Sequence, residues 1–137
     1  MIVDTSAIIS ILKAEPDARE LVLAMEASST TLKLSAATYV EIGAVIDQAR
    51  DPIASRRVDE LITGLRIQVE SVTAQQANLA REAYRDFGKG SGHPAGLNYG
   101  DCFSYALAKA CAEPLLFKGD DFRHTDVEIA YKVDKPL

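Results

Sequence analysis

The chain begins with MIVDTSAI (residues 1–8), in which an apolar run ends on Asp4 and is followed by the hydroxyl residues Thr5 and Ser6. The run is too short for a helix and is typical of a buried strand. The residues after Asp4 have helical spacing, so the stretch predicts a strand that passes directly into a helix. Asp4 then lies at the carboxyl end of the strand, where it either caps the helix or faces a ligand site.

Short apolar runs alternate with helical segments over the rest of the chain. Predicted strands are residues 1–3, 31–35, 67–72, 115–117 and 128–133. Predicted helices are residues 5–14, 17–28, 36–50, 53–66, 74–87 and 99–112. The longest irregular segment is the glycine-rich GKGSGHPAGLNYG, residues 88–100. This alternation predicts an α/β fold with a mostly parallel sheet, and such sheets bind ligands beyond the carboxyl ends of their strands.

Length and composition are those of one globular domain, residues 1–137, with 47% hydrophobic and 26% charged residues. No apolar run approaches the roughly 20 residues that span a bilayer, and the first residues lack the features of a secretion signal. Cys102 and Cys111 fall in one predicted helix, about 13 Å apart along its axis and beyond the reach of a disulfide, which fits a reducing compartment. We therefore expect a cytoplasmic protein.

The net charge of −5 narrows the possible functions. An acidic chain is not expected to adhere to nucleic acid without specificity, because the phosphate backbone repels it. A nuclease is not excluded, because a bound metal ion can invert the sign of the local field.

Glu41 is an acidic residue in an apolar setting. In the predicted helix 36–50 it shares a face with Ala37, Val40, Ala44 and Val45. A glutamate on such a face is costly to bury unless it is paired or bound to a cation. The alternative is a boundary residue whose carboxylate reaches solvent.

Asp101 follows the glycine-rich segment, in NYGD (residues 98–101). One interpretation is a capping box in which Asn98 is the N-cap and Asp101 lies in the first turn of the helix. The other is a carboxylate that projects from a helix start near the sheet edge, where the helix macrodipole favours its ionised form.

The segment LLFKGDDF (residues 115–122) repeats the opening pattern, because an apolar strand is followed by Asp120 and Asp121. Either of these acids can complete an acidic cluster or serve as a turn residue. Asp126 is a further candidate with a weaker positional argument.

Asp4, Asp101 and Asp120 all fall at the same predicted edge of the sheet. Carboxylates gathered closely repel one another, and a hard divalent cation relieves that repulsion. An oxygen-rich site without His or Cys suits Mg²⁺ or Mn²⁺. Such ions can activate water for phosphodiester cleavage, so the residues themselves predict a metal-dependent hydrolase.

Four of these features resemble the PIN domain and, more narrowly, VapC-type toxins of bacterial toxin–antitoxin pairs, over essentially the whole chain. They are IVDTSAI at the start, the helical Glu41, GLNYGDCFSYALA and LLFKGDDF. The resemblance implies a three-layer α/β/α sandwich with a central, mostly parallel sheet. It implies a Mg²⁺- or Mn²⁺-dependent endoribonuclease that cleaves RNA through a metal-activated water and is neutralised by a VapB antitoxin. It further implies a homodimer that assembles with the antitoxin into a hetero-oligomer away from any membrane.

The resemblance also assigns roles to the acids. Asp4 and Asp101 are expected to bind the metal, with Glu41 as the third acidic ligand. Asp120 matches the fourth member of the catalytic set, although Asp121 and Asp126 remain alternatives.

Two other functions compete with a ribonuclease. An aspartyl-phosphate phosphatase would use Asp4 as nucleophile, but it needs a second Asp two positions later, where Ser6 stands. A non-catalytic PIN-like module would bind RNA or antitoxin only. Lys118 and Arg123 are the basic residues predicted to lie closest to the site and to contact phosphate.

Overall fold

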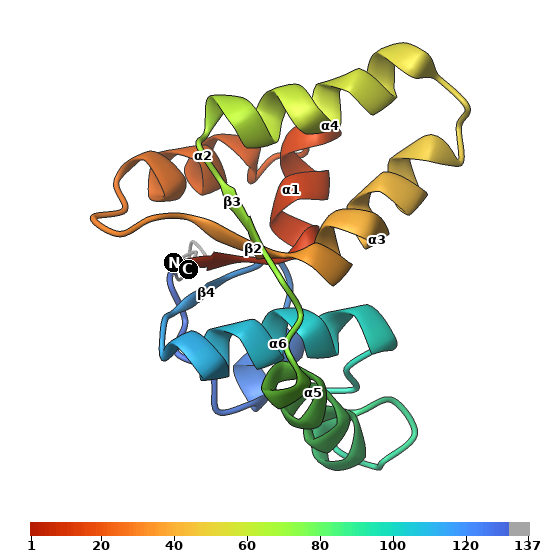
Figure 1. Ribbon diagram of the computed structural model, residues 1–137, viewed down its shortest axis with the longest axis vertical. Coiled ribbons are helices and arrows are strands. Elements are labelled where there is room, and N and C mark those ends of the chain that lie inside the picture. Colours follow the sequence, from red (N-terminus) through yellow and green to blue (C-terminus); the bar gives the residue numbers. More distant parts are fainter. Residues whose placement is uncertain (132–137) are drawn as a thin grey trace.

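The computed structural model describes residues 1–131, in which four parallel strands form one sheet between two layers of helices (Figure 1). The strands are β1 (Ile2–Val3), β2 (Lys33–Ser35), β3 (Gln68–Glu70) and β4 (Leu115–Leu116). Their order across the sheet is β3-β2-β1-β4, and every neighbouring pair is parallel. The predicted α/β/α sandwich with a parallel sheet is confirmed.

Helices cover both faces of this sheet. They are α1 (Thr5–Leu12), α2 (Ala18–Glu26), α3 (Ala36–Asp47), α4 (Pro52–Gly64), α5 (Ala74–Phe87), α6 (Tyr99–Cys111) and the 3-10 helix η1 (Asp121–His124). Figure 1 shows α1 to α4 on one face, with α5 and α6 on the other. Within residues 1–131, no helix is long and apolar enough to span a bilayer.

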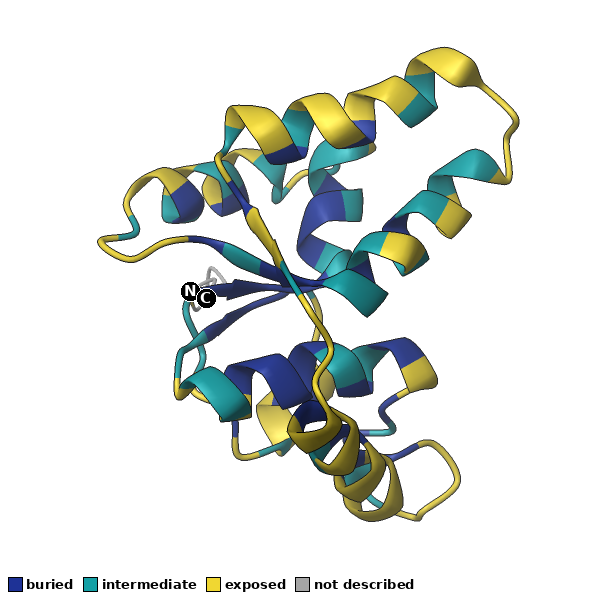
Figure 2. Cartoon of the chain, viewed as in Figure 1, coloured by how far each residue is buried: buried dark blue, intermediate teal, exposed yellow. Residues whose placement is uncertain are grey.

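Each face of the sheet has its own hydrophobic core, because successive residues of a strand point to opposite faces. Ile2 and Leu115 pack in the core beneath α5 and α6, whereas Val3 and Leu116 pack in the core beneath α1 to α4. Figure 2 shows buried residues along β1, β2 and β4 and on the inward sides of the helices, whereas the edge strand β3 is mostly exposed. The two cores therefore meet only across the sheet.

Polar side chains define where the helices begin. Asp4, Ser35, Asp51 and Thr73 each accept a hydrogen bond from a backbone N–H in the first turn of the following helix. A cap of this kind stabilises a helix by about 1 kcal/mol. Because α1 and α3 begin almost directly after β1 and β2, their first residues lie at the carboxyl edge of the sheet.

The chain reverses its order across the sheet beside β1. It runs from β1 to β2 and β3, and then returns to the other side of β1 as β4. In parallel sheets, ligands bind at the carboxyl ends of the strands next to such a reversal. Asp4 occupies this position.

The predicted last strand is not present as an extended strand in the part of the chain that the structure describes. Ile129 forms a single parallel bridge with Leu115, and residues 130 and 131 are not assigned to a strand. Residues 132 and 133 of the prediction lie outside the described residues. The other predicted elements each have a counterpart, and α5 begins and ends at the predicted residues.

The buried face of α3 is not the apolar face that the sequence predicts. Val40 is 67% exposed and Val45 is 38% exposed, whereas Thr38 and Ile42 are fully buried. Ile42 packs in the core beneath α1 to α4, with Tyr39 and Ile46 partly buried against it, and the buried Thr38 Oγ1 lies 3.3 Å from Ser104 Oγ of α6. The buried face of α3 is therefore formed by these residues rather than by the two valines.

The orientation of α3 predicts a contrast between two truncations. Ile42→Ala should lower the free energy of unfolding by about 2–5 kcal/mol, because it leaves a cavity in the core beneath α1 to α4. Val40→Ala should change it by less than about 0.5 kcal/mol, because the side chain is exposed. Urea denaturation of both variants measures the difference, and similar losses for the two would show that the apolar face is buried after all.

Candidate active site

Asp4 is buried at the end of β1 and is held through both carboxylate oxygens. Only 2% of the residue is exposed. Its Oδ1 accepts a hydrogen bond from Ser104 Oγ at 2.6 Å. Its Oδ2 accepts hydrogen bonds from Ser6 Oγ at 2.7 Å and from the Ser6 backbone N–H at 3.0 Å. Asp4 is therefore both the N-cap of α1 and a fixed carboxylate at the sheet edge.

Asp101 also has two roles. Its Oδ2 accepts the backbone N–H of Asn98 at 3.0 Å, and Asn98 Oδ1 accepts the backbone N–H of Asp101 at 2.8 Å, which completes the predicted capping box. Burial raises the pKa of this carboxyl to about 7, against the opposing hydrogen bond from Asn98, and the charges of Asp4, Asp121 and Glu41 raise it further. Asp101 therefore lies within electrostatic reach of three other carboxylates.

Glu41 enters this group from α3. Its Oε1 accepts a hydrogen bond from Thr5 Oγ1 at the start of α1. Its other oxygen occupies space left by the missing side chain of Gly100, where an added Cβ would lie 1.5 Å from Glu41 Oε2. Gly100 precedes Asp101 in α6, so Glu41 is packed against the backbone that carries Asp101.

The predicted fourth acid, Asp120, and its neighbour Asp121 are both exposed, and the charge of Asp121 contributes to the raised pKa of Asp101. The side chain of Asp120 is 64% exposed and lies 3.5 Å from Arg123 Nε. η1 begins at Asp121, and a sequence of two consecutive Asp residues does not reveal where that turn begins.

Asp126 is engaged elsewhere. Its Oδ1 accepts a hydrogen bond from the Tyr105 hydroxyl at 2.6 Å, and Lys109 Nζ lies 3.0 Å from Oδ2. Burial opposes any lowering of the pKa of Asp126, but these two hydrogen bonds lower it. Asp126 therefore serves a structural ion pair on the outer side of α6.

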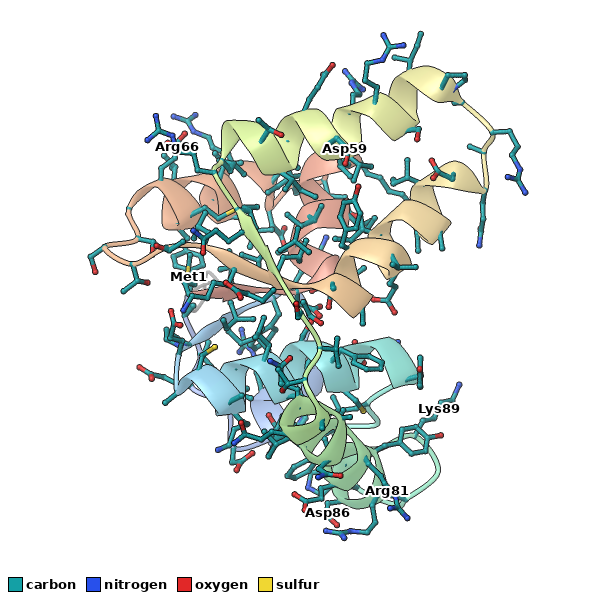
Figure 3. The ribbon with its side chains drawn as sticks, in the orientation of Figure 1. Met1, Asp59, Arg66, Arg81, Asp86 and Lys89 are labelled. Carbon is teal, nitrogen blue, oxygen red and sulfur yellow. The ribbon has the colours of Figure 1, made fainter. Side chains whose placement is uncertain are left out.

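Neither predicted phosphate-contacting cation is free. Lys118 Nζ binds Glu15 and lies 3.8 Å from Asp17, and Arg123 faces Asp120. The backbone N–H of Lys118 donates to Ser6 Oγ at 2.9 Å, so Lys118 supports Asp4 indirectly. Other basic side chains, such as Arg81 and Lys89, extend outward at the far end of the molecule (Figure 3).

The donors at this site are carboxylate oxygens, the ligands that Mg²⁺ and Mn²⁺ prefer. Within residues 1–131, however, no three His, Cys, Asp or Glu side chains are arranged so that they could hold one ion together. Glu41 in particular is turned toward Thr5. This arrangement fits Mg²⁺ bound by one or two carboxylates, because Mg²⁺ keeps several of its waters in proteins.

Two residues of the site were not predicted from the sequence. Ser104, three residues after Asp101 in α6, lies on the same helix face as Asp101, and this spacing could have indicated its role. Gly100, directly before Asp101, resembles an ordinary loop glycine in the sequence. Only the approach of Glu41 from a distant helix reveals why a side chain is absent there.

Comparisons with known proteins identify the family of this chain and its fold. Residues 1–128 match the PIN domain family. The chain is 59% identical to ribonuclease VapC28 of Mycobacterium tuberculosis, an alignment that covers 95% of this chain and 97% of the relative. It is 53% identical to ribonuclease VapC42 of the same species, with 95% and 98% covered.

Solved structures share the fold at much lower identity. The Mycobacterium tuberculosis toxin VapC20, which cleaves the sarcin–ricin loop, superposes with a TM-score of 0.72 at 15% identity over 92% of this chain and 95% of that one. A chain of the VapBC2 complex from Rickettsia felis gives a TM-score of 0.70 at 15% identity, over 93% and 94%.

The raised pKa of Asp101 predicts a pH-dependent stability. The pKa rises from its ordinary value of 3.8 to about 7 on folding, so the folded chain binds the extra proton between these values. The contribution of this group to stability is complete at low pH and is lost as the pH rises through 7. Asp101→Asn should therefore raise the melting temperature more at about pH 8 than at about pH 5.

Circular dichroism in the presence of EDTA measures this difference. Asparagine keeps an oxygen that can accept the N–H of Asn98, so the capping box survives the substitution. A shift of equal size at both pH values would show that Asp101 does not carry the extra proton.

Proposed function

The chain belongs to the PIN domain family, and we propose that it is an endoribonuclease toxin of a VapBC pair that requires Mg²⁺ or Mn²⁺. The observation that carries the proposal is that Glu41 packs against Gly100, directly before Asp101, while the charges of Asp4 and Asp121 also act on Asp101. Relatives that are named ribonucleases and are 53–59% identical over nearly the whole chain support the same activity.

Asp4 and Asp101 are the residues proposed to bind the ion directly. Glu41 would contact the ion through a water molecule, or directly after a change of rotamer. When bound, such an ion would lower the pKa of a water molecule and neutralise charge on the phosphate. Hydroxyl and backbone donors hold Asp4 in one position, so its free lone pairs have a fixed direction. Asp101 would have to release its proton to become a ligand, because burial and the neighbouring charges raise its pKa to about 7.

The proposed partners follow from the family. The substrate is RNA, and the inhibitor is a VapB-type antitoxin that places a helix in an apolar groove and a basic side chain near the acids. We also propose that the chain forms a homodimer, assembles with the antitoxin into a hetero-oligomer and acts in the cytoplasm. Relatives solved within toxin–antitoxin complexes support the assembly.

The phosphatase alternative is not favoured by the contacts of Asp4. The position where that class needs a second Asp carries Ser6, whose hydroxyl donates to Asp4 Oδ2. The other oxygen is occupied by Ser104. Ser6 thus acts as a hydrogen-bond donor to Asp4 and cannot take the role of the second Asp, which is the argument against this class.

Cleavage of structured RNA, with Mg²⁺ or with EDTA, tests the proposal. Asp4→Asn, Asp101→Asn and Asp121→Asn should each lower the cleavage rate by at least ~100-fold, because each removes charge that the ion needs. Asp120→Asn is the matched control, since this neighbouring acid faces solvent and Arg123, and it should cut at nearly the normal rate.

Each other outcome has a definite meaning. Cleavage that continues in EDTA would overturn metal dependence. Intact RNA with the unsubstituted chain, despite binding of an antitoxin, would support the non-catalytic alternative. A larger loss in Asp120→Asn than in Asp121→Asn would restore Asp120 as the fourth acid.

Gly100 provides a separate test of the site. Gly100→Ala should keep or raise the melting temperature, because alanine favours a helix by about 1 kcal/mol over glycine and the clashing Glu41 side chain can swing away. It should lower the rate of RNA cleavage by about 10- to 100-fold, because a displaced Glu41 carboxylate no longer holds the reacting groups in the right geometry. Gly64→Ala is the control, since a Cβ there meets nothing within 4 Å. Normal cleavage by Gly100→Ala would remove Glu41 from the site.

A further inference from the structure

We propose that Thr38 and Ser104 are positioning residues whose buried hydroxyls fix the carboxylate of Asp4 for the divalent ion. This inference rests on the proposed function and assigns to it two side chains that are not acidic. Ser104 Oγ donates to Asp4 Oδ1 at 2.6 Å, and Thr38 Oγ1 lies 3.3 Å from Ser104 Oγ. Thr38 and Ser104 are each 1% exposed, so water does not compete for these contacts.

The direction of the hydrogen bonds follows from the number of protons. A serine hydroxyl has one proton to donate and two lone pairs to accept with. Ser104 donates its proton to the carboxylate of Asp4, so the contact with Thr38 must be one in which Thr38 donates. The result is an ordered chain from Thr38 to Ser104 to Asp4, in which each hydroxyl polarises the next.

The hydroxyl of Ser104 does not bond within its own helix. A serine inside a helix commonly satisfies its hydroxyl on the carbonyl of the preceding turn. Here the hydroxyl instead leaves α6 and reaches a residue a hundred positions away in the sequence. Because Ser6 holds Oδ2, the contact from Ser104 fixes the second oxygen and removes the last freedom of the carboxylate to rotate.

The pair also ties together the elements that carry the other acids. Thr38 lies one turn before Glu41 in α3, and Ser104 lies one turn after Asp101 in α6. The chain of hydroxyls therefore sets the distance between these two helices and the end of β1. Groups that orient a metal ligand in this way typically contribute 10- to 100-fold to metal affinity.

Titration of the full-length chain with Mn²⁺ by isothermal calorimetry, at one fixed pH, tests the inference. Ser104→Ala should weaken Mn²⁺ binding by about 10-fold or more. Thr38→Val should weaken it less, and Thr38→Ser should restore it because the hydroxyl returns. Ser10→Ala is the matched control, since Ser10 is equally buried in α1 and, within residues 1–131, has no hydrogen-bond partner for its hydroxyl.

RNA cleavage adds a readout that a merely structural role would not move. The rate of Ser104→Ala should rise toward that of the unsubstituted chain at saturating Mn²⁺, because only the affinity for the ion has changed. Unchanged Mn²⁺ affinity in Ser104→Ala would overturn the inference. An equal loss of Mn²⁺ affinity in Thr38→Ser and Thr38→Val would also overturn it, because the hydroxyl would then play no part.

Asp4→Asn separates this inference from the proposed function. If Asp4→Asn binds Mn²⁺ as tightly as the unsubstituted chain, the ion is not bound at Asp4 and both proposals fail. If Asp4→Asn loses Mn²⁺ while Ser104→Ala keeps it, the proposed function stands and only the positioning role is overturned.

Discussion

A carboxylate buried at the end of the central strand constrains the rest of this molecule. Removing Asp4 from water is tolerable only where donors replace the lost hydration. Three donors do so, two from Ser6 and one from Ser104. Ser6 lies in the helix that follows β1, whereas Ser104 lies in α6, whose side chains pack on the opposite face of the sheet. Satisfying one buried group therefore requires helices from both layers to meet at the same sheet edge.

Once those helices meet, the other acids lie near the same sheet edge because of their places on these elements. Asp101 begins α6, Glu41 lies one turn after Thr38 in α3, and Asp121 begins the 3-10 helix that follows β4. Capping does not exclude a role at the proposed site for Asp4 and Asp101, because both carboxylates serve helix starts at the carboxyl edge of the sheet. A helix start needs an acceptor for its backbone N–H groups, and a carboxylate that supplies it is held where a cation can reach it.

The sequence predicts most of the fold because its signals are local. Apolar runs, Asp and Ser caps and helical spacing identify the strands and helices, and the parallel sheet places Asp4 and Asp101 at one edge. Features that depend on residues distant in the sequence are harder to predict. The buried face of α3 depends on packing against other elements, and the role of Gly100 depends on Glu41. A single sequence carries no record of such pairings.

The sheet divides the molecule into two cores, and this division affects when the set of acids becomes complete as the chain folds. Glu41 comes from the half formed by α1 to α4, whereas Asp101 and Ser104 come from α6, in the half formed late in the sequence. A nascent or partly melted chain that has only one half docked has an incomplete set of acids. The complete set of acids therefore forms only when both halves are docked on the sheet.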